Sequence, residues 1–136
     1  MIYRIVLIFL FPQLVFGSIW KTRDASAYLR DIERRVFKEK CHRDDADGCL
    51  KLGDYHSMVS LKFELAMMFY RKGCVLKSGR SCKEVAFLII KLRCSEITNE
   101  CVNKSLSNRK IESAVESLLT KACMLKDISS CSFLNK

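Results

Sequence analysis

The chain has 136 residues, of which 24 are Lys or Arg, 15 are Asp or Glu and eight are Cys, so its formal net charge is +9. A chain of this length accommodates one small domain. An apolar fraction of 49% excludes a disordered tail, and five glycines with one proline exclude collagen-like and low-complexity architectures. Eight cysteines in so short a chain indicate disulfides, a metal site or redox chemistry.

The segment 1–17 has the pattern of a secretory signal peptide. Its basic residue Arg4 is followed by an apolar run that starts at Ile5, and small or modest side chains precede Ser18. A membrane anchor is the alternative, but the run is shorter than the roughly 20 residues of a membrane span. We therefore predict cleavage before Ser18, no stable membrane insertion afterwards, and a mature cysteine-rich domain over 18–136 that is secreted or periplasmic.

All eight cysteines lie after this segment, so they enter an oxidising compartment and disulfides are the default prediction. They fall into four sequence-adjacent couples, of which three have the spacing C-x7-C and one C-x6-C. This regular spacing predicts a repeated structural unit, and each copy is expected to be closed by its own local disulfide. The predicted disulfides are Cys41–Cys49, Cys74–Cys82, Cys94–Cys101 and Cys123–Cys131.

Helices are predicted on both sides of three couples, in chain order. Apolar residues at helical spacing precede each first cysteine, so each is expected to end a helix. Each second cysteine is followed by another apolar segment and is expected to begin a helix. The predicted stripes are Tyr28, Leu29, Ile32 and Val36; Leu50, Leu52 and Tyr55; Leu61, Leu65, Met68 and Phe69; residues 85–90 with Leu92; Ile111, Val115, Leu118, Leu119 and Ala122; and Phe133 with Leu134.

The predicted connections are polar seven-residue bends over 42–48, 75–81 and 124–130. Ser81 to Glu84 matches a capping box, and Asp127, Ser129 and Ser130 are candidate caps for a last helix of only a turn or two. Helix, bend and helix make an αα-hairpin that a disulfide can staple at its base. The predicted fold is all-α, a short α-solenoid of such hairpins. Cys94 to Cys101 is either a decayed unit or a disulfide-closed loop, and we favour the loop.

The stretch K-A-C-M-L-K-D-I-S-S-C over 121–131 is similar to the cysteine-bearing signature of Sel1-like repeats, in the form found in the Helicobacter cysteine-rich proteins. Residues 47–55 and 68–74 resemble the second-helix opening and the first-helix end of the same repeat. The units depart from the family in length, and its glycine loop between repeats is missing. The resemblance implies a degenerate solenoid that binds proteins or peptides on a concave face.

The cysteine-rich relatives also bind penicillin and hydrolyse β-lactams weakly, which makes a β-lactamase-like hydrolase the alternative function. Such a hydrolase needs a Ser-x-x-Lys pair one helical turn apart. Ser107 and Lys110 supply one match before a helix, Ser18 to Lys21 supplies another, and Lys77-Ser78-Gly79 loosely resembles the Lys-Thr-Gly element. Because this short pattern also arises by chance, Ser107 and Lys110 are only weak catalytic candidates.

Other site chemistry has weaker support in the sequence. His42 and His56 are not at zinc-site spacing from a cysteine pair, and both are predicted to be surface residues. The carboxylates of 44–47 resemble the start of a calcium loop, but helix N-terminal carboxylates explain them. There is no Cys-x-x-Cys pair for redox catalysis. We therefore predict no metal and no cofactor, and structural cysteines.

The basic residues are scattered rather than clustered, and exported proteins seldom meet nucleic acid, so no nucleic-acid partner is predicted. The preferred function is an exported binding module for a protein or peptide ligand, and the basic charge of the chain favours an acidic one. A small secreted cysteine-rich effector is a further alternative. A location in the mitochondrial intermembrane space, where a relative of the family occurs, is the alternative to secretion.

Overall fold

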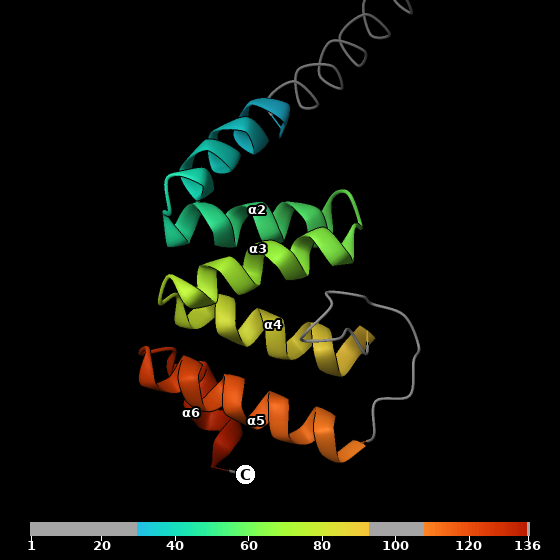
Figure 1. The fold of residues 1–136 in the computed structure, drawn as a ribbon, viewed down its shortest axis with the longest axis vertical. Helices are drawn as coiled ribbons and strands as arrows, with labels where there is room; N and C mark the ends of the chain where they lie inside the picture. Colours follow the sequence, from blue (N-terminus) through green and yellow to red (C-terminus); the bar gives the residue numbers. More distant parts are fainter. Residues whose placement is uncertain (1–29, 93–107, 136) are drawn as a thin grey trace, which may run out of the picture. The chain divides into compact units, whose positions relative to one another are not determined.

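The computed structural model describes residues 30–92 and 108–135, which form six helices and contain no strand. The first helix covers 30–42, and it is followed by α2 (Ala46–Met58), α3 (Phe63–Val75), α4 (Gly79–Leu92), α5 (Asn108–Met124) and α6 (Ile128–Leu134). The chain divides into two compact units, Met1–Arg35 and Val36–Lys136, and α2 to α6 belong to the second. Figure 1 shows them packing in chain order, each against the next.

Disulfides join Cys41 to Cys49, Cys74 to Cys82 and Cys123 to Cys131, with Cα separations of 4.4, 4.6 and 4.8 Å. Each bond staples the end of one helix to the start of the next. The all-α fold of stapled hairpins in a short solenoid is therefore confirmed, and three disulfides indicate a protein that matures in an oxidising compartment. The signal segment 1–17, the couple Cys94–Cys101 and Ser107 lie outside the described residues.

One turn geometry recurs in all three hairpins. The third residue after each first cysteine has a left-handed backbone, and the backbone N–H that follows it donates to the carbonyl five residues earlier, as in a Schellman motif. The left-handed residues are Asp44, Lys77 and Lys126, with φ of 61°, 68° and 68°. The hydrogen bonds run from Asp45 to Lys40, Ser78 to Gly73 and Asp127 to Ala122, at 3.0, 2.9 and 3.0 Å.

The residue four positions after each first cysteine caps the second helix. Its side-chain oxygen accepts a hydrogen bond from the backbone N–H three residues later, which satisfies one of the free donors of the helix start. The caps are Asp45 to Gly48, Ser78 to Ser81 and Asp127 to Ser130, at 2.8, 3.1 and 3.2 Å. The predicted role of Asp127 is thereby confirmed.

Two predictions about these turns are wrong. The bends are three residues long rather than seven, since each second helix begins three residues before its cysteine. The capping box at Ser81 to Glu84 is also wrong, because Ser78 caps α4 and Ser81 lies inside it, fully buried. A β-carbon at Gly73 would overlap the Ser81 hydroxyl. The helices α3 and α4 therefore approach closely here, because Gly73 has no side chain and that of Ser81 is small.

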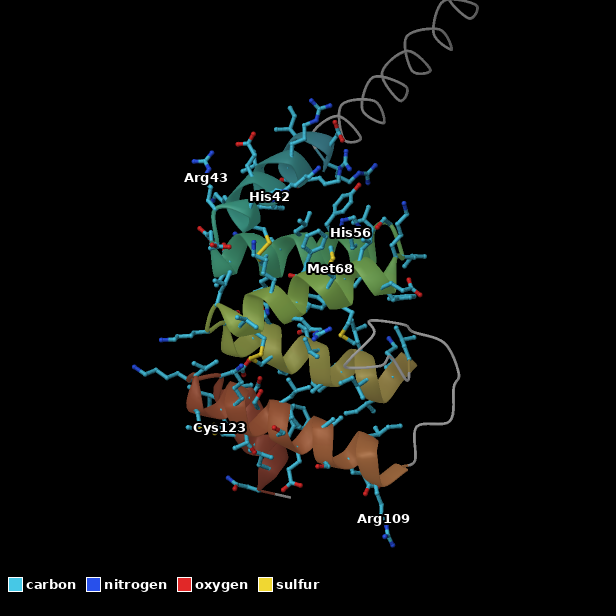
Figure 2. All side chains as sticks on the ribbon, in the orientation of Figure 1. His42, Arg43, His56, Met68, Arg109 and Cys123 are labelled. Atoms are coloured by element: carbon cyan, nitrogen blue, oxygen red, sulfur yellow. A yellow bond between two sulfur atoms is a disulfide. The ribbon has the colours of Figure 1, made fainter. Side chains whose placement is uncertain are left out.

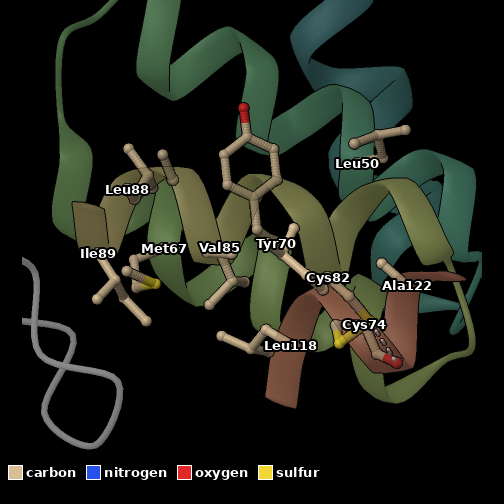
Figure 3. Packing of buried hydrophobic residues seen from close by; sticks show 13 residues of the cluster. Leu50, Met67, Tyr70, Cys74, Cys82, Val85, Leu88, Ile89, Leu118 and Ala122 are labelled. Carbon is tan, nitrogen blue, oxygen red and sulfur yellow. Dashed lines mark hydrogen bonds between the residues drawn. A yellow bond between two sulfur atoms is a disulfide. The ribbon is translucent and has the colours of Figure 1, made fainter. Parts of the chain in front are cut away.

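The core lies between α2, α3, α4 and α5, and Tyr70 of α3 crosses it toward α2 (Figure 3). The predicted stripe of α5 is confirmed, with Leu118, Leu119 and Ala122 buried. The last helix is short, as expected, with seven residues. None of the described helices is both long enough and apolar enough to span a membrane.

The predicted buried stripe of α3 is wrong except at Phe69, which is half-buried against the Cys41–Cys49 disulfide and Leu52. Leu61, Leu65 and Met68 are 65%, 37% and 43% exposed, and the helix instead buries the face that contains Met67 and Tyr70. Residues 63–70 are apolar on nearly every side, so helical periodicity alone does not select a face. The buried face contains small residues, Ala66 and Gly73 among them, which let the neighbouring helices approach closely. These small residues decide which face of α3 is buried.

Candidate functional site

Two hollows in the second unit combine apolar walls with charged side chains. One lies beside the first disulfide and has a volume of about 200 Å³, and we call it the basic pocket. The other lies among α2, α3 and α4 with a volume of about 400 Å³, and we call it the apolar cleft. The basic pocket is lined by Lys38, Cys41, His42, Met68, Phe69 and Lys72.

The basic pocket has one lysine that is held in place, and one lysine and one histidine that are available. The Lys72 ammonium donates to the carbonyl of Cys41 at 2.7 Å and pairs with Asp44 at 2.9 Å. Lys38 and His42 are exposed and form no hydrogen bond or ion pair within the described residues. The mouth of the pocket therefore offers two hydrogen-bond donors to a ligand.

The apolar wall of the basic pocket belongs to a packed layer of rings. Phe69 stacks on His56 with the ring centroids 5.4 Å apart and an angle of 14° between the planes. The Nδ1 atom of His56 lies 3.0 Å from the Ser60 hydroxyl, and this contact holds the ring at its edge. His42 is thus a surface residue at the pocket, as predicted, whereas His56 is half-buried and supports the wall.

An exposed apolar face of α3 leads into the basic pocket. Leu65, Met68 and Lys72 are spaced i, i+3 and i+7, so they lie on the same side of the helix. Met68 lines the pocket while keeping 43% of its surface exposed (Figure 2). Leu65 and Met68, which the sequence periodicity assigned to the core, therefore form a surface instead.

The apolar cleft has a hydrogen-bonded floor. The Tyr70 hydroxyl donates to Asp54 Oδ1 at 2.8 Å and lies 3.0 Å from the Ser57 hydroxyl. Tyr70 is only 1% exposed, and its burial raises the pKa of the phenol, as does the hydrogen bond to Asp54. The Tyr70 ring is consequently a fixed, neutral surface at the bottom of the cleft. The side walls of the cleft include Phe63 and Phe87.

Glu84 is the carboxylate that lines this cleft. Burial raises its pKa, and the nearby charge of Asp54 raises it further, while Lys83 and Arg80 act in the opposite direction. A carboxyl group whose pKa is raised on folding binds a proton more tightly in the native state than in the unfolded chain. Glu84 therefore lowers the stability of the native state when it is ionised.

We predict that Glu84→Gln stabilises the protein at neutral pH. Because the pKa is raised on folding, native stability is lost as pH rises above the ordinary glutamate pKa of about 4.3 and through the raised value. The amide removes this loss, so the advantage of the variant should disappear below about pH 4. Urea unfolding of both proteins across this pH range measures it, and a variant equally or less stable at neutral pH would contradict the assignment.

The β-lactamase-like candidates from the sequence are either structural residues or outside what the structure describes. Ser78 caps α4 and Lys77 has the left-handed backbone of the turn, so the Lys77-Ser78-Gly79 element has a structural role here. Lys110 lies in α5, but only its backbone is described, and its proposed partner Ser107 is outside the described residues. The structure therefore does not describe this weak catalytic pair.

The three carboxylates of 44–47 each interact with a different group of the protein. Asp44 pairs with Lys72, Asp45 caps α2, and Asp47 pairs with Lys51 at 3.0 Å. The predicted role of these residues at a helix N-terminus holds for Asp45, which caps α2, and for Asp47, which lies in the first turn of α2. Within the described ranges, no group of three or more His, Cys, Asp or Glu side chains is placed to hold a metal ion.

Sequence reasoning missed the roles of Glu84 and Lys38. For Glu84 a signal was present, since residues 84, 87, 88 and 91 share one face of α4, and a carboxylate between apolar positions marks a cleft. Lys38 gave no such signal, because one lysine among many on a basic helix is not distinctive. The contact of Tyr70 with Asp54, 16 residues apart, also has no sequence pattern.

Comparison with models of known protein families, with curated proteins and with solved structures finds no match for this chain. The resemblance to Sel1-like repeats therefore stays a prediction that depends on the motifs quoted above.

Proposed function

We propose that this chain is an exported binding module, of the Sel1-like kind, whose basic pocket receives an acidic segment of another protein. The observation that carries the proposal is the pairing of two available donors, Lys38 and His42, with the exposed apolar face of Leu65 and Met68. An extended segment that carries both carboxylates and a large apolar side chain complements this surface.

The size of the basic pocket favours one side chain of a peptide over a whole small-molecule ligand. At about 200 Å³ it is smaller than typical small-molecule sites, which start at about 300 Å³, and it suits one apolar side chain. The net charge of +9 attracts acidic partners at long range, which raises association rates more than it raises affinity. Export is proposed from the N-terminal segment and is supported by the three disulfides.

A pair of synthetic peptides tests this proposal. One alternates Glu with Leu and the other alternates Lys with Leu, and both carry the same dye and blocked ends. We expect the mature, oxidised protein to bind the acidic peptide at least about tenfold more tightly in fluorescence anisotropy, which corresponds to about 1.4 kcal/mol. The preference should shrink in high salt because exposed charges are screened.

Two variants locate the binding to the pocket. Lys38→Ala combined with His42→Ala should remove most of the preference, and Met68→Glu should repel the acidic peptide. Arg109→Ala is the matched control, because Arg109 is an exposed cation of α5 at the opposite end of the helix stack from His42 (Figure 2). Equal affinity for both peptides, or equal losses in the pocket and control variants, would refute a specific site in favour of nonspecific attraction.

A further inference from the structure

The apolar cleft contains a carboxylate that has no partner among the described residues. Glu84 is half-buried at the cleft, yet its carboxylate forms no hydrogen bond or ion pair with any described residue. The adjacent Lys83 is turned to the other side, where it binds Ser129 at 2.9 Å and Asp127 at 3.5 Å. A carboxylate that is removed from water and left unpaired is unfavourable in its ionised form. A cation in the cleft would relieve this cost.

The walls of the cleft also suit a cation with an apolar body. Phe63 and Phe87 line it together with Leu88 and Ile90, and Tyr70 forms its floor. Aromatic faces attract ammonium groups and pack against apolar carbon. Its volume of about 400 Å³ lies within the roughly 300–1,000 Å³ of small-molecule sites.

We propose that the apolar cleft binds a small organic cation, in which an ammonium group pairs with Glu84 and an apolar body packs against Phe63 and Phe87. This site is separate from the basic pocket and takes a ligand of the opposite charge, so the inference does not depend on the proposed peptide function.

The charges around Glu84 support this choice. Asp54 on α2 and Asp127 before α6 add negative potential, whereas Lys83 and Arg80 on α4 reduce it. Lys91 also lines the cleft, but it is exposed, so water and salt screen its charge. The Tyr70 phenol is neutral, with its pKa raised by burial. Among the groups within the cleft, Glu84 is thus the carboxylate available to an ammonium ligand.

The test compares phenethylamine, which is an ammonium ion at neutral pH, with 2-phenylethanol, which has nearly the same shape and no charge. Isothermal titration calorimetry on the mature, oxidised protein should give a dissociation constant for the amine at least about tenfold lower than that for the alcohol. This ratio reflects a charge-assisted hydrogen bond to a partly desolvated carboxylate. The ratio should fall as the pH is lowered and Glu84 becomes protonated.

Glu84→Gln should bring the affinity for the amine down to that for the alcohol. Glu112→Gln, at an exposed glutamate of α5, is the matched control and should leave the ratio unchanged. If Glu84→Gln does not fold, Met58→Lys decides, because Met58 lines the cleft, is 72% exposed and tolerates a long polar side chain that would repel the amine. Equal affinity for the two compounds, no binding of either, or an amine preference that persists in Glu84→Gln or in Met58→Lys would overturn the proposal.

Discussion

Replacing both Cys74 and Cys82 with alanine is expected to lower the free energy of unfolding by about 4 kcal/mol. The bond closes a loop with a sequence separation of eight residues, and the chain-entropy model gives about 2.5 kcal/mol for a loop of this length. Both cysteines also belong to the main core, with 4% and 0% of their surfaces exposed. Loss of the buried sulfur atoms should add about 1–2 kcal/mol through the cavity that remains.

The disulfide between Cys123 and Cys131 provides a control with the same loop length. Its sequence separation is also eight, but both of its cysteines are half-buried and lie outside the main core. Replacing this pair with alanine should therefore cost only the loop-closure part, about 2.5 kcal/mol. Urea unfolding followed by far-ultraviolet circular dichroism measures both losses. Equal losses would indicate that the central disulfide contributes no more than loop closure.

The hairpins were predictable from the sequence because the cysteines mark them directly. A covalent couple with a fixed C-x7-C spacing leaves few geometries, and the same cap, turn and staple recur in all three. The cap position was missed at Ser78 because Ser81 matched a short motif equally well. Once a helix begins three residues earlier, Ser81 falls on its buried side, and only the packed structure makes that visible.

Surface and core were less predictable than the helices themselves. In α3 the apolar residues surround the helix, and the buried face is chosen by which residues allow α2 and α4 to approach closely. The basic pocket follows from that choice, since Met68 faces outward only because Met67 and Tyr70 face inward. The apolar cleft likewise depends on the hydrogen bond from Tyr70 on α3 to Asp54 on α2. This contact joins residues far apart in the sequence, so no local pattern predicts it.

Both proposed sites carry a stability cost that fits a binding role. Leu65 and Met68 keep apolar surface in water, and the half-buried Glu84 carboxylate opposes folding when it is ionised. Natural proteins commonly retain such unfavourable groups where they bind ligands. The disulfides supply rigidity that the small core cannot, which lets a chain of this size keep two such surfaces.

Gly53→Ala is expected to lower the free energy of unfolding by about 2 kcal/mol, although alanine favours a helix by about 1 kcal/mol over glycine. A β-carbon at Gly53 would lie 2.5 Å from both Cδ1 and Cε1 of the Tyr70 ring. That ring cannot retreat, because it is 1% exposed and its hydroxyl is held by Asp54. The new methyl group meets two atoms of a ring that is held in place, so the cost of overpacking should be near the upper end of the typical 1–3 kcal/mol and should outweigh the gain in helix propensity.

A double-mutant cycle with Tyr70→Leu isolates the clash. The Tyr70→Leu variant is destabilised by itself, but it removes the two ring atoms that the new methyl group would meet. In that background Gly53→Ala should be neutral or stabilising by up to about 1 kcal/mol, which gives a coupling energy of about 2–3 kcal/mol. Additive effects of the two substitutions, measured by urea unfolding, would show that α2 and α3 can shift apart.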